Sequence, residues 1–256
     1  MTSGMRYEVD GHVGIITLDR PEARNALTWE LYEALERTVR EAEVRCLVIT
    51  GADPAFCAGD DVKQILSRSD EIPERSDRAP ALTPAADALL HTDVPIVAAV
   101  NGVAVGWGME LALMADIRVA SERARFGELF VKRGLVSDVP GIGRLAQLVG
   151  REAAAELLFT GRIVDAEEAL RLRLVSRVVP HDELLATALD LAGQIAANPP
   201  LAVARLKESL RRAVDPDWRD LGAWVTATLL ELFRTEDHRE SVAAFLEKRD
   251  PVYRGR

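Results

Sequence analysis

The sequence has few of the residues that build metal centres and disulfides. It contains two cysteines, Cys46 and Cys57, and four scattered histidines among 256 residues. Two cysteines do not make a disulfide framework, and the histidines show no metal-ligand spacing. We therefore expect no metal site, and we expect the cytoplasm as the compartment.

The chain also lacks a long apolar run and an excess of basic residues. No stretch approaches the roughly 20 apolar residues of a membrane helix, and the first ten residues show no apolar signal core. Lys and Arg total 32 against 41 Asp and Glu, which gives a net charge of −9. An acidic chain is a poor general binder of nucleic acid. We expect neither nucleic acid nor a membrane among its partners.

What is present is a share of apolar residues sufficient for a core, arranged in alternating patterns. Hydrophobic residues make up 48% and charged residues 29% of the chain. Short apolar runs predict strands at 13–18, 46–50, 95–100 and 117–120. Leu31 and Leu35 recur at a spacing of four after Thr28, a suitable N-cap, so a helix is predicted over 28–42. With a second helix over 109–115, this order predicts an α/β fold with crossover connections, similar to a repeat of ββα units.

The last third of the chain has a helical pattern throughout. Helices are predicted at 153–159, 165–171, 182–197, 201–213, 218–234 and 241–248. Trp218, Leu221, Val225 and Leu229 recur at helical spacing, which predicts a stripe that faces the core or another subunit. Before this region, the polar, proline-containing stretch 67–86 predicts a solvated loop, or a flap over a ligand pocket.

One glycine pattern points to a nucleotide cofactor, but weakly. Residues 141–146 (GIGRLA) match the dinucleotide motif G-x-G-x-x-G/A. That motif should follow a strand directly, whereas Asp138 and Pro140 precede it here. A nicotinamide enzyme stays as one alternative. No P-loop, G-x-S-x-G elbow or H-E-x-x-H motif occurs, so those chemistries lose their usual support.

Two other glycine turns carry more information. Residues 55–61 (AFCAGDD) and 101–112 (NGVAVGWGMELA) each follow a predicted buried strand. Side by side, such turns could direct two backbone N–H groups at one oxygen, as an oxyanion hole does, and one donor of that kind is worth roughly 3–4 kcal/mol in a transition state. The glycines could equally serve only to make tight turns. The residues alone leave both interpretations open.

These two stretches resemble the signature turns of the crotonase superfamily, the enoyl-CoA hydratase/isomerase family. The resemblance covers nearly the whole chain and includes 18–21 (LDRP), 25–27 (NAL), 98–102 (AAVNG), 125–126 (RF), 134–136 (GLV), 145–150 and 243–249 (AAFLEKR). It implies a crotonase-type spiral of ββα units in residues 1–195, which would hold the acyl-CoA site. Residues 196–256 would form a helical region of the same domain that builds a homotrimer, or a hexamer from two trimers.

The resemblance also implies the substrate and its contacts. The substrate would be an acyl-CoA thioester, with coenzyme A as part of the substrate and no separate cofactor. The backbone N–H groups of Ala58 and Trp107 would hold the thioester oxygen while an enolate forms. Further contacts to the substrate and its CoA moiety would come from Arg24, Ala26, Gly59, Asp60, Asp61, Val62 and Lys248, with Lys63 as a further basic candidate.

The resemblance also assigns the candidate acids and bases. Glu110 matches the first catalytic glutamate of the hydratases. The position of the second glutamate holds Phe130, which becomes a candidate for the acyl pocket. Glu128, two residues earlier, would share the face of Phe130 only if the backbone alternated strictly, so it is not expected to replace the missing glutamate. Asp138 stands where isomerase and dehalogenase relatives carry a catalytic aspartate.

These residues favour one reaction over another. Glu110 with Asp138 suits proton transfer between carbons, so isomerisation of a C=C bond is the preferred mechanism. Syn-hydration of a 2-enoyl-CoA to a 3-hydroxyacyl-CoA is the alternative, and a non-catalytic acyl-CoA binder is the alternative of another class. Trp107 replaces the small residue that is usual in the family, and we expect its indole to narrow or line the acyl site.

Overall fold

Two β-sheets form the frame of the protein. The computed structural model describes residues 4–62, 64–65 and 82–256. In the described residues, the larger sheet has the order β1-β2-β3-β5-β7-β10. Its strands are β1 (Met5–Asp10), β2 (Val13–Leu18), β3 (Cys46–Gly51), β5 (Ile96–Val100), β7 (Ile117–Ser121) and β10 (Arg177–Val179). Only the β1–β2 pair in this sheet is antiparallel.

The smaller sheet runs beside the first and confirms the predicted repeat. It has the order β4-β6-β8-β9 in the part of the chain that the structure describes. Its strands are β4 (Ala55–Cys57), β6 (Val103–Val105), β8 (Arg125–Gly127) and β9 (Val164–Asp165). β4, β6 and β8 follow β3, β5 and β7 directly in the chain. Each of these three turns of the spiral therefore gives one strand to each sheet, and helices connect the turns.

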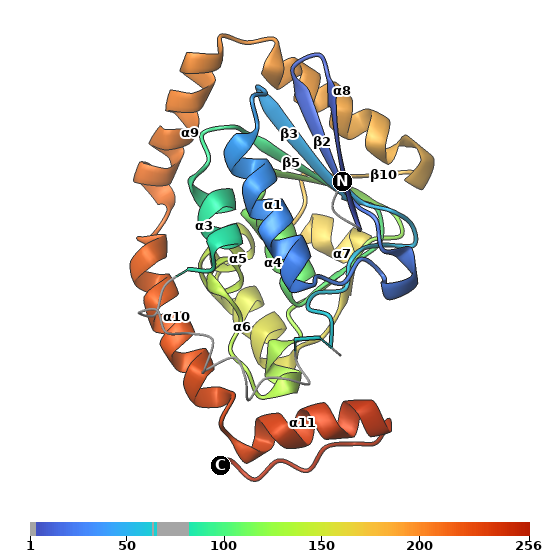
Figure 1. Cartoon of the computed structure of the whole chain (residues 1–256), viewed down its shortest axis with the longest axis vertical. Helices are drawn as coiled ribbons and strands as arrows, with labels where there is room; N and C mark the ends of the chain where they lie inside the picture. The colour runs from blue at the N-terminus through green and yellow to red at the C-terminus, as the bar shows by residue number, and fades with distance from the viewer. Residues whose placement is uncertain (1–3, 63, 66–81) are drawn as a thin grey trace.

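The central strands are buried on both faces, as their continuous apolar runs predict. In β3, Leu47 and Ile49 belong to a core shared with α1 (Trp29–Glu41), α3 (Pro84–His91) and α4 (Trp107–Met114). Cys46 and Val48 point to the other face, which α8 (Leu184–Ala196) covers. Figure 1 shows α1 and α8 on these two faces. Thr28 caps α1 by accepting from the Leu31 N–H at 3.4 Å, so the helix begins where the sequence predicts.

The C-terminal helices surround this frame. They are α5 (Val139–Val149), α6 (Arg151–Thr160), α7 (Ala166–Arg171), α9 (Pro200–Val214), α10 (Trp218–Leu232) and α11 (Glu236–Glu247). In Figure 1, α9 and α10 follow one side of the molecule and α11 lies across its end. Trp218 and Val225 of α10 are buried in the main core, so the predicted apolar stripe faces that core. α11 begins five residues before its predicted start because Thr235 accepts from the His238 N–H and caps it.

The predicted loop or flap lies mostly outside the described residues. Of the predicted loop or flap at 67–86, residues 67–81 lie outside the described residues, as does Lys63, and 84–86 begin α3. No helix in the described ranges is long and apolar enough to cross a membrane. In the same ranges, no group of three or more His, Cys, Asp or Glu side chains could hold a metal ion.

Candidate active site

The two glycine turns meet at the N-terminus of α4. Gly59 has φ +86°, and a Cβ added to it would lie 2.9 Å from the carbonyl oxygen of Val105 and 3.2 Å from the amide nitrogen of Trp107. A Cβ on Gly108 would lie 2.0 Å from the carbonyl oxygen of Cys57. Only glycine permits this approach. The two turns therefore pack backbone against backbone, as an oxyanion hole requires.

Trp107 supplies one free amide at this contact. It is the first residue of α4, so its N–H has no acceptor inside the helix. No acceptor is seen for this N–H in the described part of the chain. The helix dipole adds a partial positive charge at the same end. The Trp107 N–H is therefore available as a donor, and its role in an oxyanion hole stays a prediction.

The second expected donor, Ala58, is wrong. Its N–H donates to the carbonyl oxygen of Arg24 at 3.0 Å and so is already engaged. Two of the next three amides along the turn are also engaged. The Gly59 N–H donates to Cys57 Sγ at 3.4 Å, and the Asp61 N–H donates to the Leu27 carbonyl oxygen at 2.8 Å. The N–H of Asp60, which lies between them, has no acceptor among the described residues. The parallel bridge between Leu27 and Asp60 explains this, because it uses the groups on either side of residue 60.

Two buried asparagines, for which the sequence predicts no role, hold these turns in shape. Asn25 Nδ2 donates to the carbonyl oxygens of Ala52 and Ala55, both at 2.7 Å. Asn101 Nδ2 donates to Asp53 Oδ1 at 2.9 Å. Asn25 thus satisfies two backbone carbonyl groups of the turn, and Asn101 fixes the Asp53 side chain beside it. The sequence held one indication of this role: Asn25 and Asn101 both lie in the motifs that resemble the family, 25–27 and 98–102.

Two glutamate carboxyl groups lie together behind the turns. Glu110, in the first turn of α4, is fully buried, and its Oε2 accepts from the Gly141 N–H at 2.6 Å. Glu128, directly after β8, is also fully buried. A Cβ on Gly141 would lie 2.5 Å from Glu110 Oε1 and 3.0 Å from Glu128 Oε1. The structure thus brings Glu128 beside Glu110, which the sequence gave no reason to expect.

This glutamate pair holds its protons tightly. Among the described residues, Glu110 Oε1 and both carboxyl oxygens of Glu128 have no hydrogen-bond partner. Burial raises the pKa of Glu110 well above its usual value, and the charges of Glu128 and Asp138 raise it further. Burial likewise raises the pKa of Glu128. Because two like charges this close cannot both ionise easily, the pair carries a proton at neutral pH.

Asp138 lies near the same pair but has partners of its own. Its Oδ1 accepts from the Val139 N–H at 2.8 Å, and its Oδ2 accepts from Trp107 Nε1 at 3.2 Å. Burial raises the pKa of Asp138, and these two hydrogen bonds oppose that rise. Its charge raises the pKa of both Glu110 and Glu128, so the three carboxyl groups share one site. The predicted pair of Glu110 and Asp138 is thus brought together.

A phenol and a fourth carboxyl group complete this site. The Tyr32 hydroxyl donates to Asp60 Oδ1 at 2.6 Å. The Tyr32 ring meets the Trp107 indole edge-on, with ring centroids 4.7 Å apart and planes at 89°. Burial raises the pKa of Asp60 to about 6, with a contribution from the charge of Asp138. Tyr32 was missing from the sequence prediction because it lies far along the chain from either glycine turn.

The other residues predicted to contact the substrate lie around the first glycine turn or on the surface. Arg24 and Lys248 are exposed, and the structure shows neither in contact with the carboxyl groups of the described site. Asp61 pairs with Arg20, with Oδ2 3.1 Å from Nη2, so it has a structural partner. The others are Ala26, which is buried beside the first turn, Val62, which is partly buried, and Phe130, which is partly buried at the start of the short helix η3 (Phe130–Arg133).

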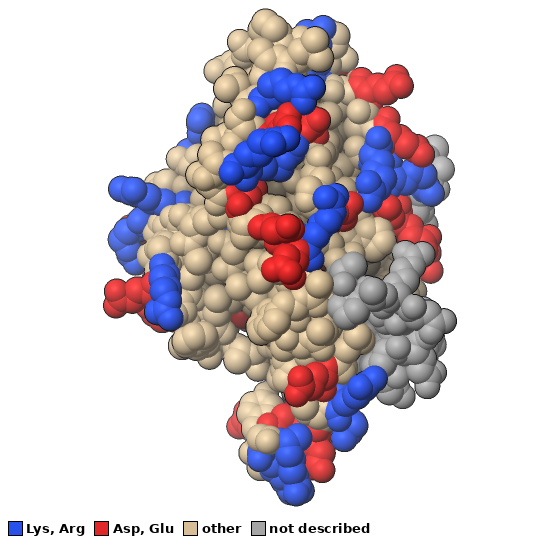
Figure 2. All heavy atoms as spheres, turned by 90° about the vertical axis from the view of Figure 1, so that its left-hand side faces the viewer, with Lys and Arg blue, Asp and Glu red and all other residues tan. Residues whose placement is uncertain are grey.

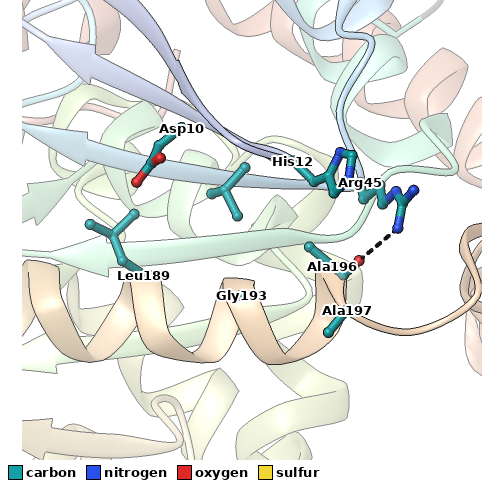
Figure 3. Close-up of a pocket in the computed structure, with 8 residues that line it drawn as sticks. Asp10, His12, Arg45, Leu189, Gly193, Ala196 and Ala197 are labelled. Atoms are coloured by element: carbon teal, nitrogen blue, oxygen red, sulfur yellow. Dashed lines mark hydrogen bonds between the residues drawn. The ribbon is translucent and has the colours of Figure 1, made fainter.

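A pocket elsewhere in the fold is separate from this site. It has a volume of about 340 Å³ and is lined by Asp10, His12, Val13, Arg45, Leu189, Gly193, Ala196 and Ala197. Figure 3 shows Arg45 donating to the carbonyl oxygen of Ala196, at 3.3 Å. This pocket lies where β2 and β3 begin, whereas the glycine turns follow the carboxyl ends of β3 and β5. None of the predicted site residues lines it.

The dinucleotide motif is not a nucleotide turn. Residues 141–146 lie inside α5, and a Cβ on Gly143 would meet the ring of Trp218 at 2.5 Å. Gly141 lies against the glutamate pair. Both glycines therefore allow close packing of a helix, and residues 141–146 do not form the strand-to-helix turn that the dinucleotide motif requires.

Comparisons with known proteins agree with this arrangement. Residues 8–256 match the family model described as enoyl-CoA hydratase/isomerase. A short-chain-enoyl-CoA hydratase of Clostridium acetobutylicum is 36% identical over 247 residues, which cover 94% of each chain. A carnitinyl-CoA dehydratase of Salmonella heidelberg is 37% identical over the full length of both chains.

Solved structures show the same likeness. An enoyl-CoA hydratase/isomerase from Pseudoalteromonas atlantica superposes with a TM-score of 0.88 at 31% identity, covering 98% of this chain and 100% of that one. A carnitinyl-CoA hydratase from Mycobacterium avium gives a TM-score of 0.85 at 37% identity, with both chains fully covered. The mixed α/β spiral and the matching family model together show that this chain belongs to the enoyl-CoA hydratase/isomerase family of the crotonase superfamily, as an enzyme that acts on CoA thioesters.

Proposed function

We propose that this enzyme moves the double bond of an enoyl-CoA thioester by transferring a proton between two carbons. The observation that carries the proposal is the contrast between its carboxyl groups. Asp138 accepts two hydrogen bonds that favour its charged form, whereas Glu110 and Glu128 are buried together and hold a proton. Carboxyl groups whose environments differ in this way serve as a base and an acid in one reaction.

The backbone amides of Asp60 and Trp107 supply the electrostatic part of this mechanism. When the substrate loses a proton next to its C=C bond, the negative charge develops on the thioester oxygen. The Trp107 N–H at the N-terminus of α4 and the Asp60 N–H in the turn after β4 stabilise that enolate, each contributing roughly 3 kcal/mol. They are present before the substrate arrives, so the site does not need to rearrange as the charge develops.

The carboxyl groups then exchange the proton. Asp138 as carboxylate accepts a proton from one carbon, and the C–H electrons move into the conjugated enolate. The glutamate pair gives its proton to the other carbon, where a new C–H bond forms as the double bond shifts. The second transfer leaves the pair with one proton fewer and Asp138 with one more. Return of that proton through the cluster completes the cycle.

Hydration is a second candidate, and Glu128 is the observation in its favour. Hydration requires two carboxyl groups around one water molecule, and Phe130 occupies the position where the family resemblance places the second. Glu128 brings a carboxyl group beside Glu110 from a different position. The names of the relatives, such as short-chain-enoyl-CoA hydratase, also favour this reaction.

Proton NMR in deuterated water separates the two reactions. With medium-chain 2-enoyl-CoA and 3-enoyl-CoA as substrates, we expect a shifted double bond with deuterium at the protonated carbon. Asp138→Asn should lower the rate at least a hundredfold, and Glu43→Gln, an exposed carboxyl group far from the site in sequence, should leave it unchanged. A 3-hydroxyacyl-CoA product would favour hydration. Binding without any reaction or deuterium exchange would overturn both.

We also propose that the enzyme assembles as a homotrimer or a hexamer through its C-terminal helices. Large apolar side chains are exposed on α9, α10 and α11: Leu201, Leu206, Leu210, Val214, Trp224, Phe245 and Leu246. Figure 2 shows the side formed by α9 and α10, where uncharged surface lies between scattered charged groups. In such an assembly, exposed Arg24 and Lys248 would be free to contact the phosphates of CoA.

A further inference from the structure

We propose that Trp107 is a positioning residue that ties the oxyanion hole to Asp138, its backbone N–H facing the thioester oxygen while its indole N–H holds the carboxylate. The proposal rests on the proposed function for the role of Asp138. The indole belongs to the same residue as one oxyanion donor, so a single rigid side chain sets the distance between donor and base. The expectation that the indole lines the acyl site assigned it no such hydrogen bond.

The first support is the geometry around Asp138. The indole is almost fully buried, with 4% of its residue surface exposed, and its Nε1 lies 3.2 Å from Asp138 Oδ2. The other oxygen, Oδ1, accepts from the Val139 N–H at 2.8 Å, where Asp138 caps α5. Each carboxylate oxygen therefore has its own donor. With both oxygens held, the carboxylate cannot rotate freely about its terminal bond.

The second support is what holds the indole itself. The Tyr32 ring packs edge-on against it at 4.7 Å between centroids, and the Tyr32 hydroxyl donates to Asp60 Oδ1. Contacts thus run without a gap from Asp60 through Tyr32 and Trp107 to Asp138. Asp60 and Trp107 carry the two free amides of the oxyanion hole. The side chains form one connected unit across both turns, and such networks hold their members more firmly than isolated pairs.

The electrostatic surroundings explain why this hydrogen bond matters. The titratable groups that face Asp138 are Glu110, Glu128, Asp60 and Tyr32. Each is acidic, so ionisation of any of them disfavours the charged form of Asp138. Burial raises the pKa of Asp138 as well, and the indole N–H is one of the two donors that oppose these effects. Without it, Asp138 would be protonated at a higher pH and would turn away more easily.

The first test needs no substrate. In protein labelled with 15N-tryptophan, Trp107→Phe identifies the indole N–H resonance of Trp107 among the four tryptophans. We expect this resonance to move with pH as Asp138 titrates, and to lose most of that movement in Asp138→Asn. A resonance that does not respond to pH and is unchanged in Asp138→Asn would overturn the proposal. The result is the same whichever reaction the enzyme catalyses, so failure of the proposed function would be seen separately.

The second test measures turnover. Trp107→Phe keeps a ring against Tyr32 but removes the donor, so kcat should fall about ten- to hundredfold with KM changed less than about threefold, the scale of one hydrogen bond to a charged group. The acidic limb of the pH profile should move to higher pH. The matched control is Trp218→Phe, because Trp218 Nε1 donates to Asp215 Oδ2 at 3.0 Å away from the site, and its profile should not move. A loss of kcat in Trp107→Phe with an unmoved profile would mean a purely structural role.

Discussion

At the scale of single residues, the site depends on where carboxyl groups lose their contact with water. Asp138 accepts two hydrogen bonds, whereas Glu128 is fully buried and burial raises its pKa. The sequence located Glu110 and Asp138 because their positions match family motifs. It did not locate Glu128, because the short turn after β8 does not follow the alternation of an extended strand. The direction of a side chain in such a turn is set by packing and not by spacing.

The buried Glu128 carboxyl group predicts how stability depends on pH. Its pKa is raised in the folded state above the ordinary value of about 4.3. A raised pKa means that the folded protein binds the proton more tightly, so its contribution to stability is fully present below about pH 4.3 and is lost as pH rises through the folded pKa. Glu128→Gln should remove this dependence, which makes the variant relatively more stable at pH 9 than at pH 5. Urea unfolding at both pH values measures the difference, and parallel curves for variant and wild type would contradict it.

At the scale of elements, the site depends on how closely α5 approaches α4. The sequence predicted the central strands and most of the later helices, because their apolar patterns are continuous. It predicted no helix at 139–149, because Pro140, Gly141 and Gly143 have the composition of a turn. Tertiary contacts override this local preference: Gly141 fits against Glu110 and Glu128, and Gly143 fits against Trp218. β1 was missed for a related reason, since its residues are mostly exposed and lack an apolar pattern.

The close contact between α4 and α5 predicts that one added methyl group at Gly141 lowers both stability and turnover. A Cβ at Gly141 would lie 2.5 Å from Glu110 Oε1, closer than packed atoms allow. Gly141→Ala should therefore destabilise the fold by about 1–3 kcal/mol and lower turnover more than tenfold by displacing Glu110. Gly193→Ala in α8 is the matched control, because its added Cβ would meet no other described part of the chain within 4 Å and alanine favours a helix by about 0.5–1 kcal/mol. Equal effects in both variants, by urea unfolding and turnover, would exclude this explanation.

At the scale of the whole molecule, α9 presents a surface suited to another subunit. Leu206 and Leu210 lie one helical turn apart and are 66% and 63% exposed. Together with the other exposed apolar side chains of α9, α10 and α11, they form more apolar surface than is usual on a monomer. We expect light scattering to give the mass of three or six chains for the wild type. Leu206→Glu with Leu210→Glu should give smaller species, and Arg212→Glu, on the opposite side of the same helix, should not. A monomeric wild type would disprove the assembly.

The alternation of strands and helices, the family and the two glycine turns follow from the sequence, because apolar periodicity and ordered motifs are properties of the chain alone. Which amide is free and which carboxyl groups meet depends on how the folded chain packs. The Ala58 N–H donates to the Arg24 carbonyl oxygen, whereas the bridge to Leu27 leaves the Asp60 N–H without an acceptor among the described residues. The Trp107–Asp138 hydrogen bond joins residues 31 positions apart, and such distances in space are set by packing that no local pattern records.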